Sequence, residues 1–131
     1  MIVLDASILV NLVGDDSEAG RHARSILAEQ IDASIPDLAD VETMNALRRR
    51  WFAGELDPER FESAIEYLTE LPVMRHPTLP LLPRIFALKE NLTPYDATYV
   101  ALAEALNCPL VTADARLSRS PGIRCEVQLV G

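Results

Sequence analysis

The sequence predicts an α/β domain in which a central parallel sheet is covered by helices on both faces. Short apolar runs recur along the chain, and segments with helical periodicity separate them. Strands that alternate with helices pair in parallel, because each connecting helix carries the chain back across the sheet. The chain has 131 residues, 49% of them hydrophobic, which suits one domain with one core. We therefore expect a single domain over residues 1–131 with four to five strands.

The first half of the chain alternates strands and helices. The expected elements are, in order, a strand at 2–4, helices at 6–13 and 17–31, a strand at 33–35 and a helix at 36–54. Gly14 and Gly54 suit the ends of two of these helices. Apolar residues recur at helical spacing in the second helix, namely Ala19, Ala23, Ile26, Leu27 and Ile31.

The second half continues this alternation. The expected elements are helices at 57–71, 79–90 and 93–106, strands at 73–75, 110–112 and 124–129, and a short helix at 115–119. Asp57 and Pro58 suit an N-cap followed by the first helical position. Pro83 is tolerated only near the start of a helix, because proline lacks the N–H that deeper positions donate.

The composition excludes several classes of protein. The formal charge is −8, so the protein as a whole repels phosphates, which argues against a DNA-reading module. An enzyme whose acids are neutralised by metal ions stays possible. No apolar run approaches the roughly 18–20 residues of a membrane span, and no signal-peptide pattern is present. Two histidines and two cysteines form no zinc pattern and no Ser-His-Asp order. We expect a cytoplasmic protein.

Two acids lie at the carboxyl ends of predicted strands. Asp5 comes after the first strand, and Asp114 comes shortly after the strand at 110–112. The carboxyl ends of parallel strands meet at one edge of a sheet, where ligands gather. Each acid also has a purely structural interpretation as the N-cap of the helix that follows it.

Two further acids lie on predicted helices. Asp96 is the third residue after Thr93, so it resembles part of a capping box. Glu42 lies inside the long helix, one turn from Leu38 and from Ala46 on its apolar side, and a partly buried carboxylate needs a partner. A surface position for Glu42 is the alternative.

Together the four acids favour a metal site. Carboxylates crowded into one cleft repel one another, and a divalent cation relieves that repulsion. Mg²⁺ and Mn²⁺ prefer carboxylate oxygen, and the absence of histidine and thiolate ligands argues against zinc. Such ions orient a phosphodiester and activate water for its hydrolysis. The sequence leaves open whether one or two ions bind.

Four motifs resemble those of the PIN-domain ribonucleases, and more closely those of the VapC toxins of toxin–antitoxin pairs. The motifs are IVLDASILV, PDLADVETMNALRR, LTPYDATYVALAEAL and LVTADARL. They carry, in this order, Asp5 with Ser7, Glu42 with Asn45, Asp96, and Thr112 with Asp114. Some members have a further acid shortly after the fourth, where this chain has Arg116.

The resemblance implies a PIN-like three-layer sandwich and Mg²⁺- or Mn²⁺-dependent cleavage of RNA. Asp5, Asp96 and Asp114 would bind the metal, and Glu42 would bind it or hold one of its waters. Hydrolysis would leave a 5′-phosphate and a 3′-hydroxyl. The side chains expected to hydrogen-bond these acids are Ser7, Asn11, Asn45 and Thr112. For Ser7, capping of the first helical turn is the alternative.

The resemblance also implies partners: an RNA substrate, a cognate antitoxin that inhibits the enzyme, and a second copy in a homodimer. Arginines close to the acids in sequence are candidates for binding RNA, namely Arg48, Arg49, Arg50, Arg116 and Arg119. The antitoxin groove is expected from Trp51, Phe52, Phe61, Ile65 and Leu68. The alternatives are arginines that only stabilise a helix C-terminus and apolar residues that only pack in the core.

Two other functions compete with the nuclease. A receiver-type phosphotransfer domain has this size and a strand-end acid, but it needs an adjacent acidic pair near the first strand and a lysine after the last. Here Asp15 and Asp16 fall beyond a helix, and Lys89 is the only lysine. A phosphatase loop needs a second aspartate two residues after Asp5, where this chain has Ser7. A non-catalytic PIN-like binding module is the remaining alternative.

Overall fold

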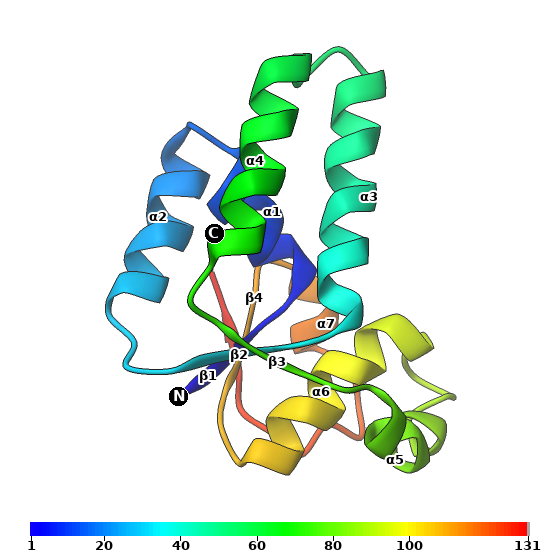
Figure 1. The fold of residues 1–131 in the computed structure, drawn as a ribbon. Coiled ribbons are helices and arrows are strands. Elements are labelled where there is room, and N and C mark those ends of the chain that lie inside the picture. Colours follow the sequence, from blue (N-terminus) through cyan, green and yellow to red (C-terminus); the bar gives the residue numbers. More distant parts are fainter. Residues whose placement is uncertain (131) are drawn as a thin grey trace.

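Five parallel strands form the centre of the molecule, in the order β3-β2-β1-β4-β5 (Figure 1). The computed structural model describes residues 1–130, so Gly131, the last residue of the expected domain, lies outside the described part. The strands are β1 Ile2–Leu4, β2 Ala33–Pro36, β3 Met74–His76, β4 Leu110–Thr112 and β5 Val127–Leu129. The predicted parallel α/β architecture with up to five strands is confirmed.

Helices cover both faces of this sheet. They are α1 Ala6–Gly14, α2 Glu18–Ala28, α3 Leu38–Phe52, α4 Pro58–Glu70, the 3₁₀ helix η1 Leu79–Leu81, α5 Leu82–Ala87, α6 Pro94–Leu106 and α7 Ala115–Ser118. On one face α6 packs against β1, β2 and β4, and α5 packs on α6. On the other side α1 contacts α2, α3 and α4, so these four helices form one layer (Figure 1). Within residues 1–130 no helix is long and apolar enough to cross a membrane.

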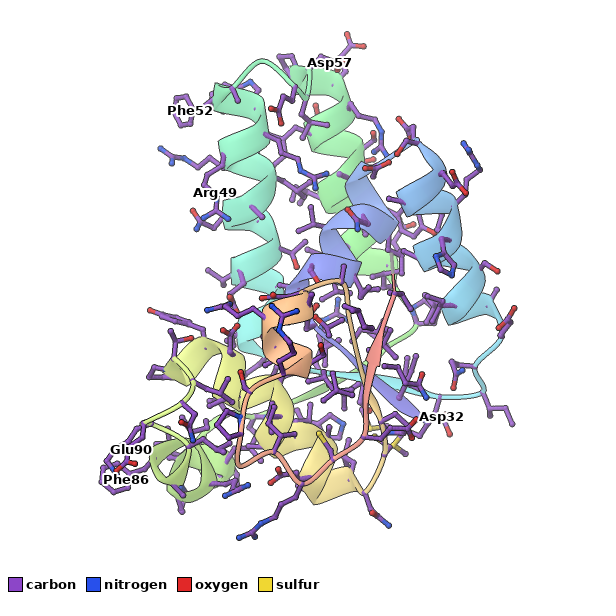
Figure 2. The ribbon with its side chains drawn as sticks, turned by 180° about the vertical axis from the view of Figure 1, so that it is seen from behind. Asp32, Arg49, Phe52, Asp57, Phe86 and Glu90 are labelled. Atoms are coloured by element: carbon purple, nitrogen blue, oxygen red, sulfur yellow. The ribbon has the colours of Figure 1, made fainter. Side chains whose placement is uncertain are left out.

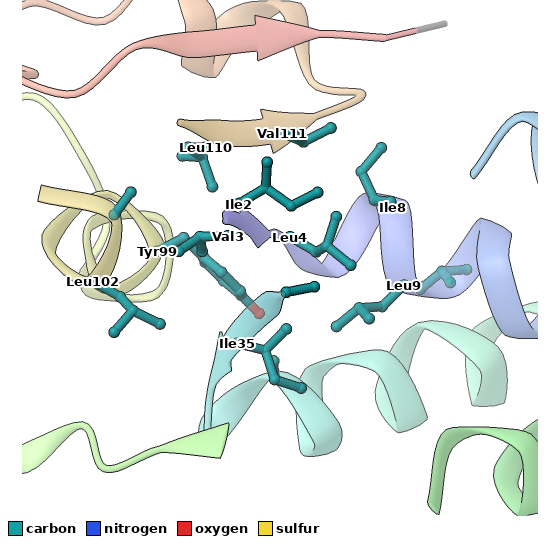
Figure 3. Packing of buried hydrophobic residues seen from close by; sticks show 14 of the residues in the cluster. Ile2, Val3, Leu4, Ile8, Leu9, Ile35, Tyr99, Leu102, Leu110 and Val111 are labelled. Atoms are coloured by element: carbon teal, nitrogen blue, oxygen red, sulfur yellow. The ribbon is translucent and has the colours of Figure 1, made fainter. Parts of the chain in front are cut away.

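The core lies on both sides of β1, the middle strand. Val3 and Leu4 are fully buried, as expected for a strand that has helices on both faces. Tyr99 and Leu102 of α6 reach this core from one side, and Ile8 and Leu9 of α1 lie on the other (Figure 3). Burying each such side chain contributes roughly 1.5–3 kcal/mol, so this packing fixes the strand ends that carry the acids.

Four predicted boundaries were wrong. The helix predicted at 17–31 ends at Ala28, and Ile31 is 97% exposed, because the chain must turn there to enter β2. The helix predicted at 79–90 divides into η1 and α5, which places Pro83 in a first turn where its missing N–H costs nothing. The strand predicted at 124–129 begins only at Val127, and β3 lies one residue later than predicted.

Candidate active site

Asp5 lies at the carboxyl end of β1 and caps α1. Its Oδ1 accepts hydrogen bonds from the backbone N–H groups of Ser7, at 2.9 Å, and Ile8, at 3.4 Å, as an N-cap requires. The Ser7 hydroxyl also donates to this oxygen. The side chain is 6% exposed, and burial raises the pKa of Asp5 although these hydrogen bonds act in the opposite direction.

Thr112 connects two of the acids. Its hydroxyl donates to Oδ2 of Asp5 at 2.6 Å and accepts from the backbone N–H of Asp114 at 3.0 Å. The backbone N–H of Ala113 donates to the Ser7 hydroxyl at 3.0 Å. These bonds exist because β1 and β4 are parallel neighbours whose carboxyl ends coincide. The expectation that Ser7 and Thr112 hydrogen-bond the acid cluster therefore has a direct geometric basis.

Glu42 reaches the same region from α3. It accepts a 2.8 Å hydrogen bond from the hydroxyl of Tyr99, which lies on α6 and is 2% exposed. Burial raises the pKa of Glu42, the charges of Asp96 and Asp5 raise it further, and the Tyr99 bond opposes them. Burial and the charge of Glu42 likewise raise the pKa of Tyr99, so the phenol stays a donor. Tyr99 is a site residue that the sequence motifs did not indicate, although a tyrosine in an apolar helix signals a buried hydroxyl in need of a partner.

Asp96 and Asp114 meet at one arginine. A single guanidinium nitrogen of Arg116 lies 3.0 Å from Asp96 Oδ2 and 3.1 Å from Asp114 Oδ2. Burial would raise the pKa of Asp114, but its hydrogen bonds with Arg116 outweigh this and lower it. Asp96 lies in the first turn of α6, where Thr93 caps the helix, and Asp114 caps α7. Their predicted capping roles and their convergence therefore coexist.

The residues fit a hard divalent cation. The donor set is carboxylate and hydroxyl oxygen, which Mg²⁺ and Mn²⁺ prefer. A cationic nitrogen already lies between two of the carboxylates, which shows that this position accepts positive charge. Within residues 1–130 no three acids, histidines or cysteines are close enough to form a finished metal cage. An ion would therefore have to draw the acids together and displace the Arg116 side chain, which is 68% exposed.

The structure places the other predicted polar residues in different environments. Asn11 accepts from Nη2 of Arg50 at 3.4 Å rather than contacting an acid. Asn45 is exposed on α3 and makes no side-chain hydrogen bond in the described part of the chain. Arg48 lies over the ring of Phe52, with 4.4 Å between its guanidinium carbon and the ring centroid, whereas Arg49 and Arg50 line a groove beside Glu42.

The residues predicted for an antitoxin groove are only partly exposed. Trp51 packs on Phe52 and Phe61, with ring centroids 4.8 Å and 6.1 Å apart. Phe52 is 65% exposed at the free end of α3 (Figure 2). Leu68 is 4% exposed, so it belongs to the core and is not open to a partner. Ile65 and Phe61 are half-buried against the same core.

Sequence comparisons identify the family of this chain. The sequence profile of the PIN domain matches residues 2–123. The ribonuclease VapC1 of Mycobacterium tuberculosis is 39% identical over 129 residues, covering 98% of this chain and 96% of the relative. The ribonuclease VapC9 of the same organism is 40% identical over 130 residues, covering 99% and 98%. The chain therefore belongs to the VapC ribonucleases of the PIN-domain family.

Solved structures show the same fold at lower sequence identity. VapC20 of M. tuberculosis, described as a toxin that cleaves the sarcin-ricin loop, has a TM-score of 0.73 and 16% identity, covering 95% of this chain and 97% of that one. VapBC2 of Rickettsia felis, bound to a DNA fragment of its promoter, has a TM-score of 0.70 and 16% identity over the full length of both chains. The three-layer arrangement of this chain is thus that of VapC proteins.

Proposed function

We propose that this chain is an endoribonuclease toxin that hydrolyses RNA phosphodiester bonds with Mg²⁺ or Mn²⁺ held by Asp5, Glu42, Asp96 and Asp114. The observation that carries the proposal is a chain of contacts between four carboxylates from four elements: Thr112 links Asp5 with Asp114, Arg116 links Asp114 with Asp96, and the charges of Asp96 and Asp5 act on Glu42. Two of them, Asp5 and Glu42, have raised pKa values because burial disfavours their charged forms. Perturbed acids gathered in one cleft are typical of functional sites.

The chain's own residues hold these acids in place. Thr112 and Ser7 fix both oxygens of Asp5, and Tyr99 fixes one oxygen of Glu42. Hydrogen bonds of this kind orient metal-binding carboxylates. When bound, the ion supplies Lewis-acid polarisation of the phosphate and activation of water, which gives a 5′-phosphate and a 3′-hydroxyl. Arg116, once displaced from Asp96 and Asp114, is free to pair with a phosphate oxygen.

An antitoxin and a second copy are the proposed protein partners of a cytoplasmic toxin. Two neighbours in fold are VapBC complexes, from R. felis and from Salmonella typhimurium. The exposed aromatic side chains of Trp51 and Phe52 support an apolar contact with an antitoxin. Leu82 and Phe86, also exposed, lie on α5 on the other side of the sheet and support a contact between copies (Figure 2).

Digestion of total RNA tests the enzymatic proposal. Antitoxin-free protein is incubated with Mg²⁺, Mn²⁺ or EDTA, beside the variant Asp96→Asn. We expect discrete cuts with 5′-phosphate ends that EDTA abolishes. Asp96→Asn should lose at least about 100-fold in rate, because residues that merely support metal ligands cost 10–100-fold.

Asp32→Asn is the matched control. Asp32 is exposed at the amino edge of the sheet, beyond the predicted site, so the substitution changes the same charge and leaves the acid cluster intact (Figure 2). Cleavage that persists in EDTA or in Asp96→Asn would contradict the metal site. Absence of any cleavage would favour a non-catalytic binding module.

A further inference from the structure

A groove of about 630 Å³ leads away from the acid cluster between α1 and α3. We call it the α1–α3 groove. On the α1 side it is lined by Ser7, Val10 and Asn11, and on the α3 side by Glu42, Ala46, Arg49, Arg50 and Ala53, with Ala6 and Glu55 at its ends. Because Ser7 and Glu42 belong to the candidate active site, the groove opens directly onto it.

The spacing along α3 makes the groove a continuous track. Positions 42, 46, 49, 50 and 53 recur every three or four residues, so they share one face of the helix. Arg49 follows Glu42 by seven residues, or about 10.5 Å at 1.5 Å per residue. A stacked nucleic-acid strand carries one phosphate per roughly 3.4 Å of its axis, so this distance spans about three nucleotides.

The two arginines of the groove are available to bind an anion. Arg50 lies across the groove, where its Nη2 donates to Asn11, and it forms no ion pair within residues 1–130. Arg49 is an exposed residue of α3 at the same groove and forms no ion pair in the same part of the chain (Figure 2). In contrast, the arginines that do pair with acids are Arg60, Arg75, Arg84 and Arg116.

Stabilisation of the helix C-terminus explains part of this pattern. Arg49 and Arg50 lie in the last turn of α3, where positive charge is favourable. Stabilisation of the helix C-terminus does not depend on which face of α3 an arginine occupies. The neighbouring Arg48 lies over the ring of Phe52 instead of in the groove. Of the three consecutive arginines Arg48, Arg49 and Arg50, the last two line the groove, together with Glu42 and Ser7.

We propose that the α1–α3 groove binds single-stranded RNA next to the cleaved bond, with Arg50 and Arg49 holding the backbone phosphate about three nucleotides away. The inference rests on the proposed nuclease function. It offers a local attraction for RNA on a chain with a formal charge of −8, because two arginines that form no ion pair within residues 1–130 lie together in the groove, beside Glu42 and Glu55. It also predicts that substrate length on one side of the cut affects binding.

Fluorescence anisotropy tests this inference. The probe is a fluorescein-labelled single-stranded RNA of twelve nucleotides with the sequence around a cut mapped in the total-RNA digest. Binding is measured with Mg²⁺ in the Asp96→Asn background, which does not consume the probe. We expect Arg49→Ala and Arg50→Ala each to weaken binding about tenfold, the usual scale for a hydrogen bond to a charged group. Each should lower the salt slope by about 0.7.

A second series locates the contact along the strand. The probe is shortened from either end until only two nucleotides remain on that side of the cut. For the end that enters the groove, shortening should weaken binding by the parent protein, and Arg49→Ala should then have no further effect. Shortening the other end should leave the effect of Arg49→Ala unchanged. Equal effects from both ends would overturn the proposed track.

Two further variants separate the groove from general electrostatic attraction. Arg124→Ala removes the same charge at the opposite edge of the sheet, where Arg124 lines a different cavity, and should leave binding unchanged. Arg48→Ala removes an adjacent charge outside the groove and should have a smaller effect than Arg49→Ala. Equal losses in Arg48→Ala and Arg49→Ala, or no loss in Arg49→Ala and Arg50→Ala, would overturn the inference.

The outcomes also distinguish this inference from the proposed function. Metal-dependent cleavage together with unchanged RNA binding in Arg49→Ala and Arg50→Ala would support the nuclease function and contradict RNA binding in the α1–α3 groove. If total RNA yields no cut, a twelve-nucleotide oligouridylate serves as the probe. If binding of that RNA depends on Arg49 and Arg50 but no cleavage is seen, the result would support RNA binding in the groove and contradict the nuclease function.

Discussion

Asp5 and Glu42 at the carboxyl edge of the sheet lie in an environment opposite to that of Glu104 at the amino edge. Asp5 is buried and Glu42 half-buried, neither forms an ion pair within residues 1–130, and burial raises their pKa values. At the amino edge Glu104 accepts from Nε of Arg84 at 2.6 Å and from the backbone N–H of Arg124 at 2.8 Å. Burial of Glu104 opposes these bonds, but they prevail and lower its pKa.

One helix, α6, carries acids at both edges, since Asp96 is in its first turn and Glu104 in its last. The difference therefore comes from the partners that the fold supplies. At the amino edge the guanidinium of Arg84 satisfies the acid and also donates to the backbone carbonyl of Gly122. At the carboxyl edge Arg116 pairs with Asp96 and Asp114 but not with Asp5 or Glu42, and the proposed function assigns the neutralisation of these two acids to a bound cation.

Loss of the Thr112 hydroxyl should have the largest effect and would break the carboxyl edge. Thr112→Val keeps the shape of the side chain but removes the link between Asp5 and Asp114. We expect RNA cleavage to fall roughly 10–100-fold, with weaker Mg²⁺ affinity by calorimetry.

Thr98→Val is the matched control for that change. Thr98 is equally buried, but its hydroxyl donates only to the Pro94 carbonyl within α6. An equal loss of activity in both variants would mean that Thr112 acts through packing alone.

Glu104→Gln should have the next largest effect, because it removes the charged acceptor that pairs with Arg84 at the amino edge. Replacing a charged acceptor should lower the free energy of unfolding by about 1.5 kcal/mol near pH 7, without affecting cleavage per folded molecule. The pKa of Glu104 is lower in the folded protein than its ordinary value of 4.5, so its stabilising contribution is present above that pH.

The contribution of Glu104 is lost as the pH falls through its folded-state pKa. The difference between wild type and Glu104→Gln should therefore shrink in urea titrations performed below pH 4.5. A difference that stays constant with pH would mean that the carboxylate charge is not what stabilises this edge.

The smallest effect is expected at Glu42 and would measure how the charge of this residue affects stability at the carboxyl edge. Glu42→Gln should raise the free energy of unfolding at pH 7 in EDTA, by less than about 1 kcal/mol, because it removes a buried charge and keeps an acceptor for Tyr99. Mg²⁺ should then stabilise wild type more than the variant in thermal melts. If the Glu42→Gln variant is less stable than wild type in EDTA, contacts within the folded protein already offset the cost of burying the Glu42 charge.

Much of the candidate site was predictable from the sequence because its acids occupy positions that local rules specify. Asp5 directly follows β1, Asp114 follows β4 after one residue, and each caps the next helix, so their places are fixed by the chain itself. Parallel pairing then brings their strand ends together. The α/β architecture followed from the same alternation of strands and helices.

What the sequence did not predict depends on how whole helices are rotated and packed. Tyr99 reaches Glu42 only because α6 and α3 meet across the sheet edge, a relation between residues 57 positions apart. The rotation of α3 likewise decides that Arg50 faces α1 while Arg48 faces Phe52. Helical periodicity gives the relative faces of such residues but not which face meets the neighbouring helix.

The order of the strands also has a consequence for when the toxin becomes active during its synthesis. β1 pairs with β4, so Asp5 meets Thr112 only after more than a hundred residues have been translated. A ribosome that adds about 5–20 residues per second therefore holds an incomplete site for several seconds. A chain released before residue 114 lacks the fourth acid of the proposed site. Under the proposed function, RNA cleavage can therefore begin only after nearly the whole chain has been synthesised.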